Sequence, residues 1–317
     1  ITLLVQQFTM QIRYMKFPLV LVTLILATLF TTPIRAEVQG SISSYVWSNQ
    51  GEFNLDGNHP SVQNRWDIKH PTDGLMLSGN TYLFELKYDQ MLSLDVNINT
   101  GSINDQRRSF IVHDSNGYLT DLSYADVAGR SRLASSGLFY RLMGKDDLAI
   151  SRLDIGAGYI GYINSIGYNN PSVVLDSANP ANNNQTFNER WEEYDIYYSG
   201  MDVRVKEELY LTSFLTVNVM GGYAPKLSAR YHYTKFPDRP AAQQQKQTID
   251  AEGYGIHYEV FFNYYLTEHF STIVGYKYLL LKVKGKSYDN FYPFWTGGAH
   301  NLKNEMDGYI LGVAYHF

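Results

Sequence analysis

The fold is decided by the last stretch of the chain, MDGYILGVAYHF (306–317). Side chains alternate faces along an extended strand, so one face here carries Tyr309, Leu311, Val313, Tyr315 and Phe317. The opposite face carries smaller or polar residues, from Gly308 to His316. This pattern is expected of the closing strand of an outer-membrane barrel, where the outer face meets lipid and the interior is polar. A soluble sandwich can also end on an alternating strand, so the rest of the chain has to distinguish the two.

Residues 1–36 are predicted to be a signal peptide, and the residues before Met10 or Met15 are consistent with an over-extended gene start. Arg13 and Lys16 precede an apolar run at 17–30, and cleavage is expected after Ala36. The alternative, a transmembrane anchor, needs about 20 apolar residues, which is longer than this run.

Composition narrows the classes of protein that the remaining segment, 37–317, can form. The chain has no Cys, which excludes disulfides and thiolate chemistry, and its formal charge of −5 comes without a basic block for nucleic acid. No cofactor-binding or metal-binding motif is present. The 27 Tyr residues outnumber the 16 Phe. Tyr is favoured in the aromatic girdles of membrane barrels, where one end of the ring is in lipid and the other is wet.

Period-two patterns and connection lengths predict a single all-β domain, an antiparallel transmembrane barrel of ten strands in the outer membrane of a Gram-negative cell. Short connections are expected to alternate with long polar ones at 56–73, 105–130, 169–188, 235–248 and 287–302. All short turns then lie at one end of the barrel, together with both termini. The strands are expected at roughly 40–55, 74–88, 91–104, 131–143, 150–168, 189–206, 210–234, 249–266, 269–286 and 303–317.

The polar faces of these strands are predicted to point into the lumen. We expect a network of mutually neutralising charges rather than a wide diffusion pore, because a small barrel holds little beyond side chains and water. The candidates are Glu85, Lys87, Asp95, Arg141, Asp154, Arg204, His257, Glu259 and Lys277.

Three segments, in the same order along the chain, resemble the omptins, the ten-stranded outer-membrane proteases. They are NRWDIK (64–69) with the strand and YDQM turn that follow, LDIGAGY (153–159), and GYGIHYEVFFNYYLT (253–267) with the strand leading to KGKS. The resemblance implies an omptin-like barrel across nearly the whole mature chain.

Omptins use two acidic pairs that face each other across the rim, an Asp-x-Asp and an Asp-x-His, to activate and position water. The counterpart of the first pair here is Asp121 with Ser123, where a hydroxyl replaces the second carboxylate. The counterpart of the second pair is Arg230 with His232, where Arg replaces the Asp. Arg disfavours imidazolium and cannot orient the neutral ring as Asp does. Asp121 and His232 are therefore candidate catalytic residues with altered partners.

A displaced acid would restore such a site, and two are available: Asp126 beside Asp121, and Asp238 beside His232. The positions through which omptins contact lipopolysaccharide are also altered. Tyr159 matches, but Gly161 and Ile163 stand at the acidic and basic positions that follow it in the family.

Two further segments have both a functional and a structural interpretation. The run WEEYD (191–195) holds three acids that suggest a divalent cation, but alternate facing separates them, which favours solvated rim charge. The aromatic residues at 291–295 are either a patch for a surface partner or a cover over the barrel mouth.

The sequence therefore favours a monomeric, non-proteolytic omptin-like barrel with a structural, adhesive or ligand-binding role at the cell surface. Its expected partners are outer-membrane lipid, lipopolysaccharide and an extracellular protein or peptide. Two alternatives stay open: an omptin-type endopeptidase with an altered site, and a narrow pore or transporter.

Overall fold

The computed structural model describes residues 37–58, 65–71, 74–78, 81–87, 91–113, 118–144, 150–177, 180–289 and 299–317. The predicted signal peptide and the aromatic segment at 291–295 lie outside these residues. So do the side chains of Glu85 and Lys87. Among the residues that the structure describes, no helix is long and apolar enough to cross a membrane.

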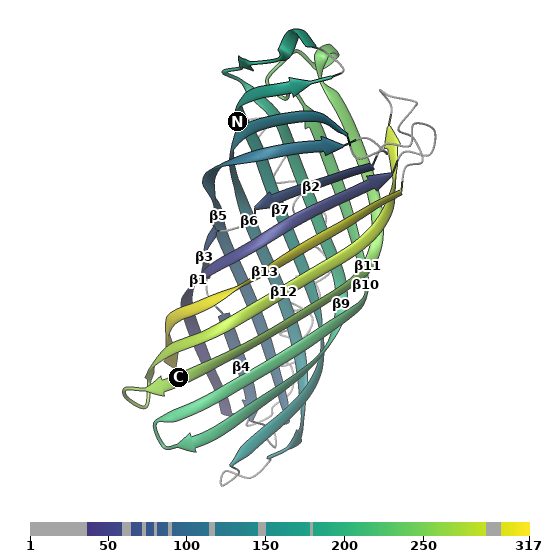
Figure 1. Ribbon diagram of the computed structural model, residues 1–317. Helices are drawn as coiled ribbons and strands as arrows, with labels where there is room; N and C mark the ends of the chain where they lie inside the picture. Colours follow the sequence, from purple (N-terminus) through teal and green to yellow (C-terminus); the bar gives the residue numbers. More distant parts are fainter. Residues whose placement is uncertain are drawn as a thin grey trace.

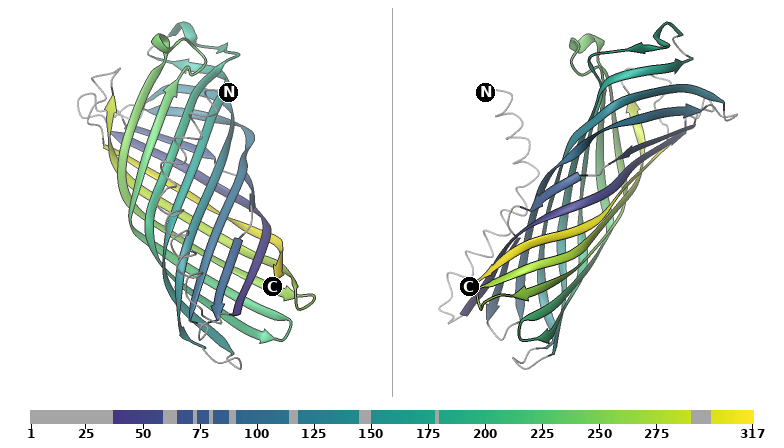
Figure 2. Two further views of the ribbon diagram at one scale, coloured as in Figure 1. Left: turned by 180° about the vertical axis from the view of Figure 1, so that it is seen from behind. Right: turned by 60° about the vertical axis from the view of Figure 1, so that its left-hand side comes forward.

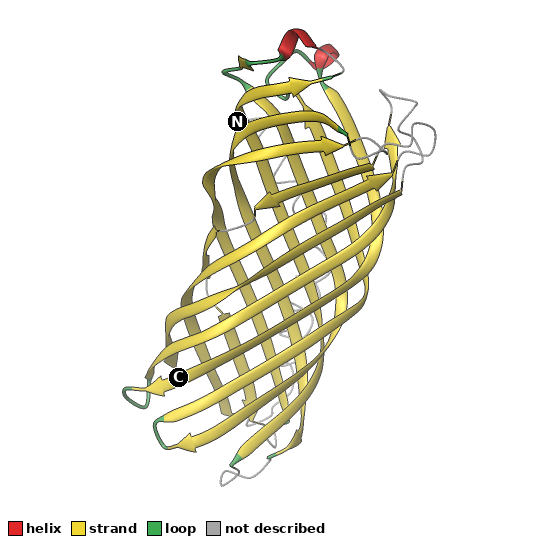
Figure 3. Ribbon diagram, in the orientation of Figure 1, coloured by secondary structure: helices red, strands yellow, loops and turns green. Residues whose placement is uncertain are grey.

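The described chain is almost entirely strand, with two short 3-10 turns near one end (Figure 3). The elements are β1 (Glu37–Asn58), β2 (Arg65–Pro71), β3 (Gly74–Ser78), β4 (Thr81–Lys87), β5 (Leu92–His113), β6 (Leu119–Met143), β7 (Ser151–Asp176), η1 (Pro180–Asn182), β8 (Gln185–Thr186), β9 (Arg190–Thr212), β10 (Leu215–Lys235), η2 (Ala241–Gln243), β11 (Gln245–Tyr265), β12 (Phe270–Asp289) and β13 (Ala299–His316).

The strands form one closed antiparallel barrel with strongly tilted strands (Figure 1). The last strand closes the barrel by pairing with the first, from Ser41 opposite His316 up to Asn58 opposite Ala299. Gly40 and Phe317 exchange backbone hydrogen bonds of 2.9 Å at the lower end. The short strands β2, β3 and β4 together take the second position in the wall, which gives the ten positions that the sequence predicts.

The C-terminal strand has the alternation that decides the fold. Tyr309, Leu311 and Val313 are 75%, 65% and 56% exposed on the outer wall, whereas Ile310 and Ala314 are buried inside. Large apolar side chains surround the barrel at this height, as expected of a surface in contact with lipid. The predicted facing of the closing strand is confirmed.

Aromatic side chains mark both edges of this apolar belt. Phe270 packs on Tyr315 near the lower end, at 5.1 Å between ring centroids, and Tyr276 packs on Tyr309 further up, at 5.8 Å. Above the upper girdle the outer face becomes charged, with exposed lysines at 282, 284 and 286 on β12. The barrel therefore extends beyond the membrane at the end opposite the C-terminus, which is the extracellular end of such barrels.

The predicted long loop at 105–130 is wrong, because most of it is strand. β5 continues to His113 and β6 begins at Leu119. The pairing of these strands shifts register between Ile103 and Gln106, and β6 shifts against β7 between Tyr124 and Asp126. Each irregularity moves side chains to the other face, so the period-two pattern is interrupted while the backbone hydrogen bonds continue.

Candidate functional site

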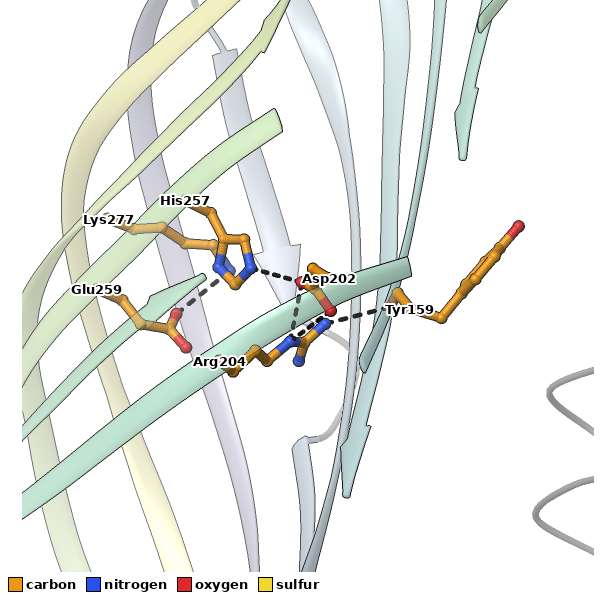
Figure 4. Close-up of polar contacts among 6 residues, drawn as sticks. All are labelled: Tyr159, Asp202, Arg204, His257, Glu259 and Lys277. Carbon is orange, nitrogen blue, oxygen red and sulfur yellow. Dashed lines mark hydrogen bonds and ion pairs between the residues drawn. The ribbon is translucent and has the colours of Figure 1, made fainter. Parts of the chain in front are cut away.

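The lumen holds a network of buried charges that are contributed by several strands around the wall (Figure 4). Arg204 on β9 donates to Asp202 on the same strand, at 2.9 Å, and the two side chains are 1% and 0% exposed. His257 Nε2 on β11 lies 2.7 Å from Asp202 Oδ2, the same carboxylate oxygen that Arg204 contacts. Lys277 on β12 lies 3.4 Å from Glu259 on β11.

Two further ion pairs extend the network toward the opposite wall. Arg141 on β6 donates to Asp154 on β7 at 3.0 Å, and Lys206 on β9 lies 3.8 Å from Asp95 on β5. Charges taken out of water require partners, and each acid of the network has a cation within ion-pair distance.

Glycines on neighbouring strands make room for these long side chains. A Cβ at Gly222 on β10 would lie 2.1 Å from His257 Nε2. One at Gly158 on β7 would lie 2.5 Å from both the Asp202 carboxylate and the Arg204 guanidinium. Glycine therefore stands at the wall positions that the network side chains cover, because any larger residue there would overlap with them.

The predicted lumenal candidates whose side chains are described all face inward and are buried or paired. They are Asp95, Arg141, Asp154, Arg204, His257, Glu259 and Lys277. The sequence interpretation missed Asp202 and Lys206. Both share the parity of Arg204 on β9, so the alternation along MDVRVK (201–206) already carried the signal. Three or more His, Asp or Glu side chains grouped to hold a metal are not found among the described residues.

Above the charges, the extracellular half of the lumen is filled by apolar and aromatic side chains. Tyr194 lies at its centre, 5.6 Å from Tyr168, 5.7 Å from Tyr231 and 5.1 Å from Tyr233 between ring centroids. Phe53 on β1 stacks on Tyr231 at 6.3 Å from the far side of the barrel. This aromatic core occupies the space beneath the extracellular rim.

One tyrosine bridges the lumen between nearly opposite walls. Tyr162 on β7 lies 3.2 Å from Ser131 on the neighbouring strand and donates to Met306 Sδ on β13 at 3.3 Å. In the strand order, β7 and β13 are separated by about half of the wall in either direction. The interior is therefore crossed by side chains as well as lined by them.

The candidate catalytic residue His232 lies on the outer face of β10. Its neighbour Tyr231 is buried in the aromatic core, so His232 and Arg230 point away from the lumen. His232 Nδ1 lies 3.1 Å from the Thr248 hydroxyl, and its ring packs edge-on against Tyr197 at 6.0 Å. The site that this residue could form faces the surroundings of the barrel.

The altered partner Arg230 is itself engaged, at 2.7 Å from Asp250 on β11, with both side chains half-exposed. This part of β10 lies above the upper girdle, outside the membrane span. Burial, and then the Arg230 guanidinium, hold the pKa of His232 below its usual value, opposed by Asp195 and Asp250. Asp195 stands directly opposite His232 in the register of β9 and β10.

The other candidate, Asp121, lies on β6 in register with Asp176 of β7, and Ser123 is on the same strand. Two strands, β7 and β9, separate β6 from β10. The register leads from His232 through Asp195 and Ser165 to Arg130 on β6, and Asp121 lies nine residues further along that strand. Asp121 and His232 are therefore offset by about 30 Å along the strand direction, in addition to three inter-strand steps of about 4.8 Å each. Their catalytic role stays a prediction.

Tyr159, which matches an omptin lipopolysaccharide position, is half-buried and faces outward on β7. Its backbone carbonyl accepts a hydrogen bond from Arg204 at 3.2 Å.

The acidic run at 191–195 divides between the two faces, as the alternation predicts. Glu193 and Asp195 face outward. The prediction of solvated charge is wrong for Glu192, which is buried because its side chain points inward. It accepts from Tyr233 at 3.0 Å and from Tyr194.

The connections β7–β9 and β10–β11 form a cap at the extracellular end (Figure 2). Trp191 packs against Phe187 and Phe236, with 5.0 Å between ring centroids in each case. Arg239 stacks on Phe236 at 3.9 Å and is paired with Glu189 across the two connections, its Nε at 3.0 Å. The cap is thus held by aromatic, cation–π and ionic contacts.

Comparisons with known proteins show which solved structures share this architecture. No family model matches the sequence, and no curated protein matches it. The crystal structure of the outer membrane protease OmpT from Escherichia coli superposes with a TM-score of 0.66 at 13% identity, over 88% of this chain and 97% of that chain. The translocator domain of the autotransporter NalP from Neisseria meningitidis covers 98% of this chain at 12% identity, with a TM-score of only 0.38.

At these identities the likeness establishes the fold alone. The inward charges, the apolar belt with its girdles and the superposition all lead to one assignment. The chain is an outer-membrane β-barrel of ten strand positions with a distant omptin-like fold.

Proposed function

We propose that this barrel is a closed scaffold without protease activity that binds a ligand at the cell surface through its extracellular cap. The observation that carries the proposal is the cap, where two connections far apart in sequence are fixed to each other. The Arg239–Glu189 pair links the two connections. At their base the backbone N–H of Phe236 donates to the Trp191 carbonyl at 2.8 Å, which extends the β9–β10 ladder by one hydrogen bond.

The conformation of Phe236 supports a binding role for the cap. Its φ is +57°, in the left-handed region that bulky residues rarely adopt. Such strain concentrates at functional sites. Here it holds the Phe236 ring between Trp191 and Arg239. Trp and Arg are also the residue types that dominate the energetics of protein interfaces.

The geometry of the predicted catalytic residues supports a scaffold rather than a protease. His232 faces outward, its neighbour Arg230 is paired with Asp250, and the lumen below the rim is filled by the aromatic core. A peptide in a rim cleft would have to displace buried tyrosines. The network and the core likewise support a closed lumen over a pore. Contact with lipopolysaccharide and a monomeric state stay predictions.

Adhesion of cells that display the barrel tests the proposal. Trp191→Ala and Arg239→Ala should each reduce adhesion to epithelial cells or an extracellular-matrix array, because they remove the centre of the cap. Lys246→Ala, an exposed change on β11, is the matched control. Equal adhesion by all four strains, at equal surface abundance, would refute a binding role for the cap.

One observation favours the endopeptidase as a second candidate. Asp195 faces His232 from the neighbouring strand and can replace the acid that Arg230 displaced. Incubating the refolded barrel with lipopolysaccharide and basic peptides tests this. Cleavage that is lost in both His232→Ala and Asp195→Asn would support the candidate, and absence of cleavage by the unmodified barrel would exclude it.

A further inference from the structure

The hydroxyl of Tyr162, which reaches across the lumen from β7 to β13, is the centre of a small polar cluster. It lies 3.2 Å from Ser131 Oγ on β6 and 3.3 Å from Met306 Sδ on β13. Ser131 in turn donates to Asn164 Oδ1 on β7 at 2.6 Å. Contacts from three strands therefore fix the position of this hydroxyl between the walls.

Two side chains beside this hydroxyl carry polar atoms with no hydrogen-bond partner in the described part of the chain. Tyr198 on β9 stands opposite Tyr162 in the register, with 6.1 Å between the ring centroids, and its hydroxyl is unpaired. Asn304 on β13 lies close enough to the Tyr162 hydroxyl to interact with it, yet neither of its amide atoms completes a hydrogen bond. Tyr162, Tyr198 and Asn304 are 0%, 2% and 1% exposed, so bulk water does not reach them.

The count of protons shows that the cluster does not satisfy itself at these positions. The Ser131 hydroxyl proton goes to Asn164, and the Tyr162 proton goes to Ser131 or to Met306. The Tyr162 oxygen is then an acceptor only. The Tyr198 hydroxyl and the Asn304 nitrogen are donors without an acceptor, and the Asn304 oxygen is an acceptor without a donor. Most buried polar atoms have a partner, because leaving one unpaired in a dry core is unfavourable.

A water molecule matches this set of atoms. It can accept from the Asn304 nitrogen, donate to the Tyr162 oxygen and exchange a further hydrogen bond with the Tyr198 hydroxyl. Buried waters typically make about three such bonds to groups that are otherwise unpaired. An ion matches the set less well, because donors and acceptors are both unpaired and all three side chains are neutral.

We propose that Tyr162, Tyr198 and Asn304 hold a structural water that links the closing strand β13 to β7 and β9 across the lumen. In the wall itself, β13 pairs with β12 and β1, and β7 and β9 are not its neighbours. The water therefore adds a connection that the backbone ladder does not supply. The site is separate from the extracellular cap and does not depend on a binding role there.

A double-mutant cycle of Tyr198→Phe and Asn304→Leu tests this link, because the two side chains share no direct hydrogen bond. We expect each single variant to raise the equilibrium constant of unfolding about fivefold, the equivalent of one hydrogen bond. The double variant should raise it little further, because either change alone breaks the bridge. Removing a dry, unpaired polar group is instead neutral or stabilising. Unchanged or lower constants for the single variants, or effects that simply multiply in the double variant, would overturn the proposal.

Tyr198→Phe combined with Met220→Leu is the matched control for the cycle. Met220 is buried on β10 in register with Lys206 of the charge network, whereas Tyr198 is in register with Ala229. The exchange conserves volume, and the effects of two distant changes should multiply.

A crystal structure that resolves ordered water gives the second readout. We expect electron density within hydrogen-bond distance of both the Asn304 amide and the Tyr198 hydroxyl. An Asn304 amide bonded directly to a tyrosine hydroxyl, with no density between the side chains, would overturn the proposal.

Discussion

Replacing Arg204 with Met tests the charge network most sharply, because it removes one member of a fully buried pair and keeps most of the volume. The Asp202 carboxylate, with no exposed surface, then retains His257 as its partner among the described residues. Breaking a buried pair on one side costs about 3–5 kcal/mol. The lost hydrogen bond to the Tyr159 carbonyl adds about 1 kcal/mol. We expect Arg204→Met to lower the free energy of unfolding by about 4–6 kcal/mol.

The double variant Asp202→Leu/Arg204→Met supplies the control. Removing both charges leaves no orphaned ion, and apolar replacement of a whole buried pair is often neutral or stabilising. The His257 ring and the Tyr159 carbonyl still each lose a hydrogen bond, at about 1 kcal/mol apiece. We therefore expect the double variant to return to within about 1–2 kcal/mol of the parent. Urea titrations in lipid vesicles, begun from both the folded and the unfolded state, measure these differences. A single variant that loses less than about 1 kcal/mol, or a double variant no better than the single, would refute the reasoning.

Three further predictions follow from individual contacts. Gly222→Ala should lower the yield of refolded barrel, because its Cβ meets the His257 ring at 2.1 Å, whereas Gly221→Ala, with nothing within 4 Å, should refold normally; equal yields would contradict this. Arg230→Ala should change the free energy of unfolding by less than about 1 kcal/mol, since it breaks a half-exposed pair, and a larger loss in the same titration would be inconsistent with that exposure. In an NMR pH series the His232 imidazole should titrate below its usual pKa of about 6.5. Because the folded state favours the neutral ring, its contribution to stability is present above about pH 6.5 and is lost on acidification. A folded-state pKa above about 6.5 would contradict the burial described.

The fold was predictable from the sequence because lipid imposes a strict rule on the membrane-spanning part of each strand. The alternation in MDGYILGVAYHF (306–317) and in GYGIHYEVFFNYYLT (253–267) reports directly which side chains face lipid and which face the lumen. The extension above the membrane was less predictable. Water tolerates polar residues on the outer face there, and bulges such as the one near Tyr124 shift the period. The sequence pattern at 105–130 therefore resembles a loop although most of the segment is strand.

The candidate site was predictable only in part. Parity along the strands placed Glu259 and Lys277 in the lumen, but it does not give the register between strands, which decides that Asp202 meets His257. The same limit applies to Glu192, whose inward facing was implied but whose tyrosine partners come from packing. For His232, the resemblance to omptins suggested a catalytic rim, whereas its side chain faces outward because Tyr231 takes the inward position.

Closure of the lumen by the charge network and the aromatic core can be measured by electrical recording. The purified barrel is inserted into a planar lipid bilayer, and insertion is verified by protease protection of the membrane-embedded part. A closed lumen predicts no discrete conductance steps above the bare bilayer over a range of voltages. Reproducible ohmic steps that scale with salt concentration would show an open pathway through the lumen and contradict its closure.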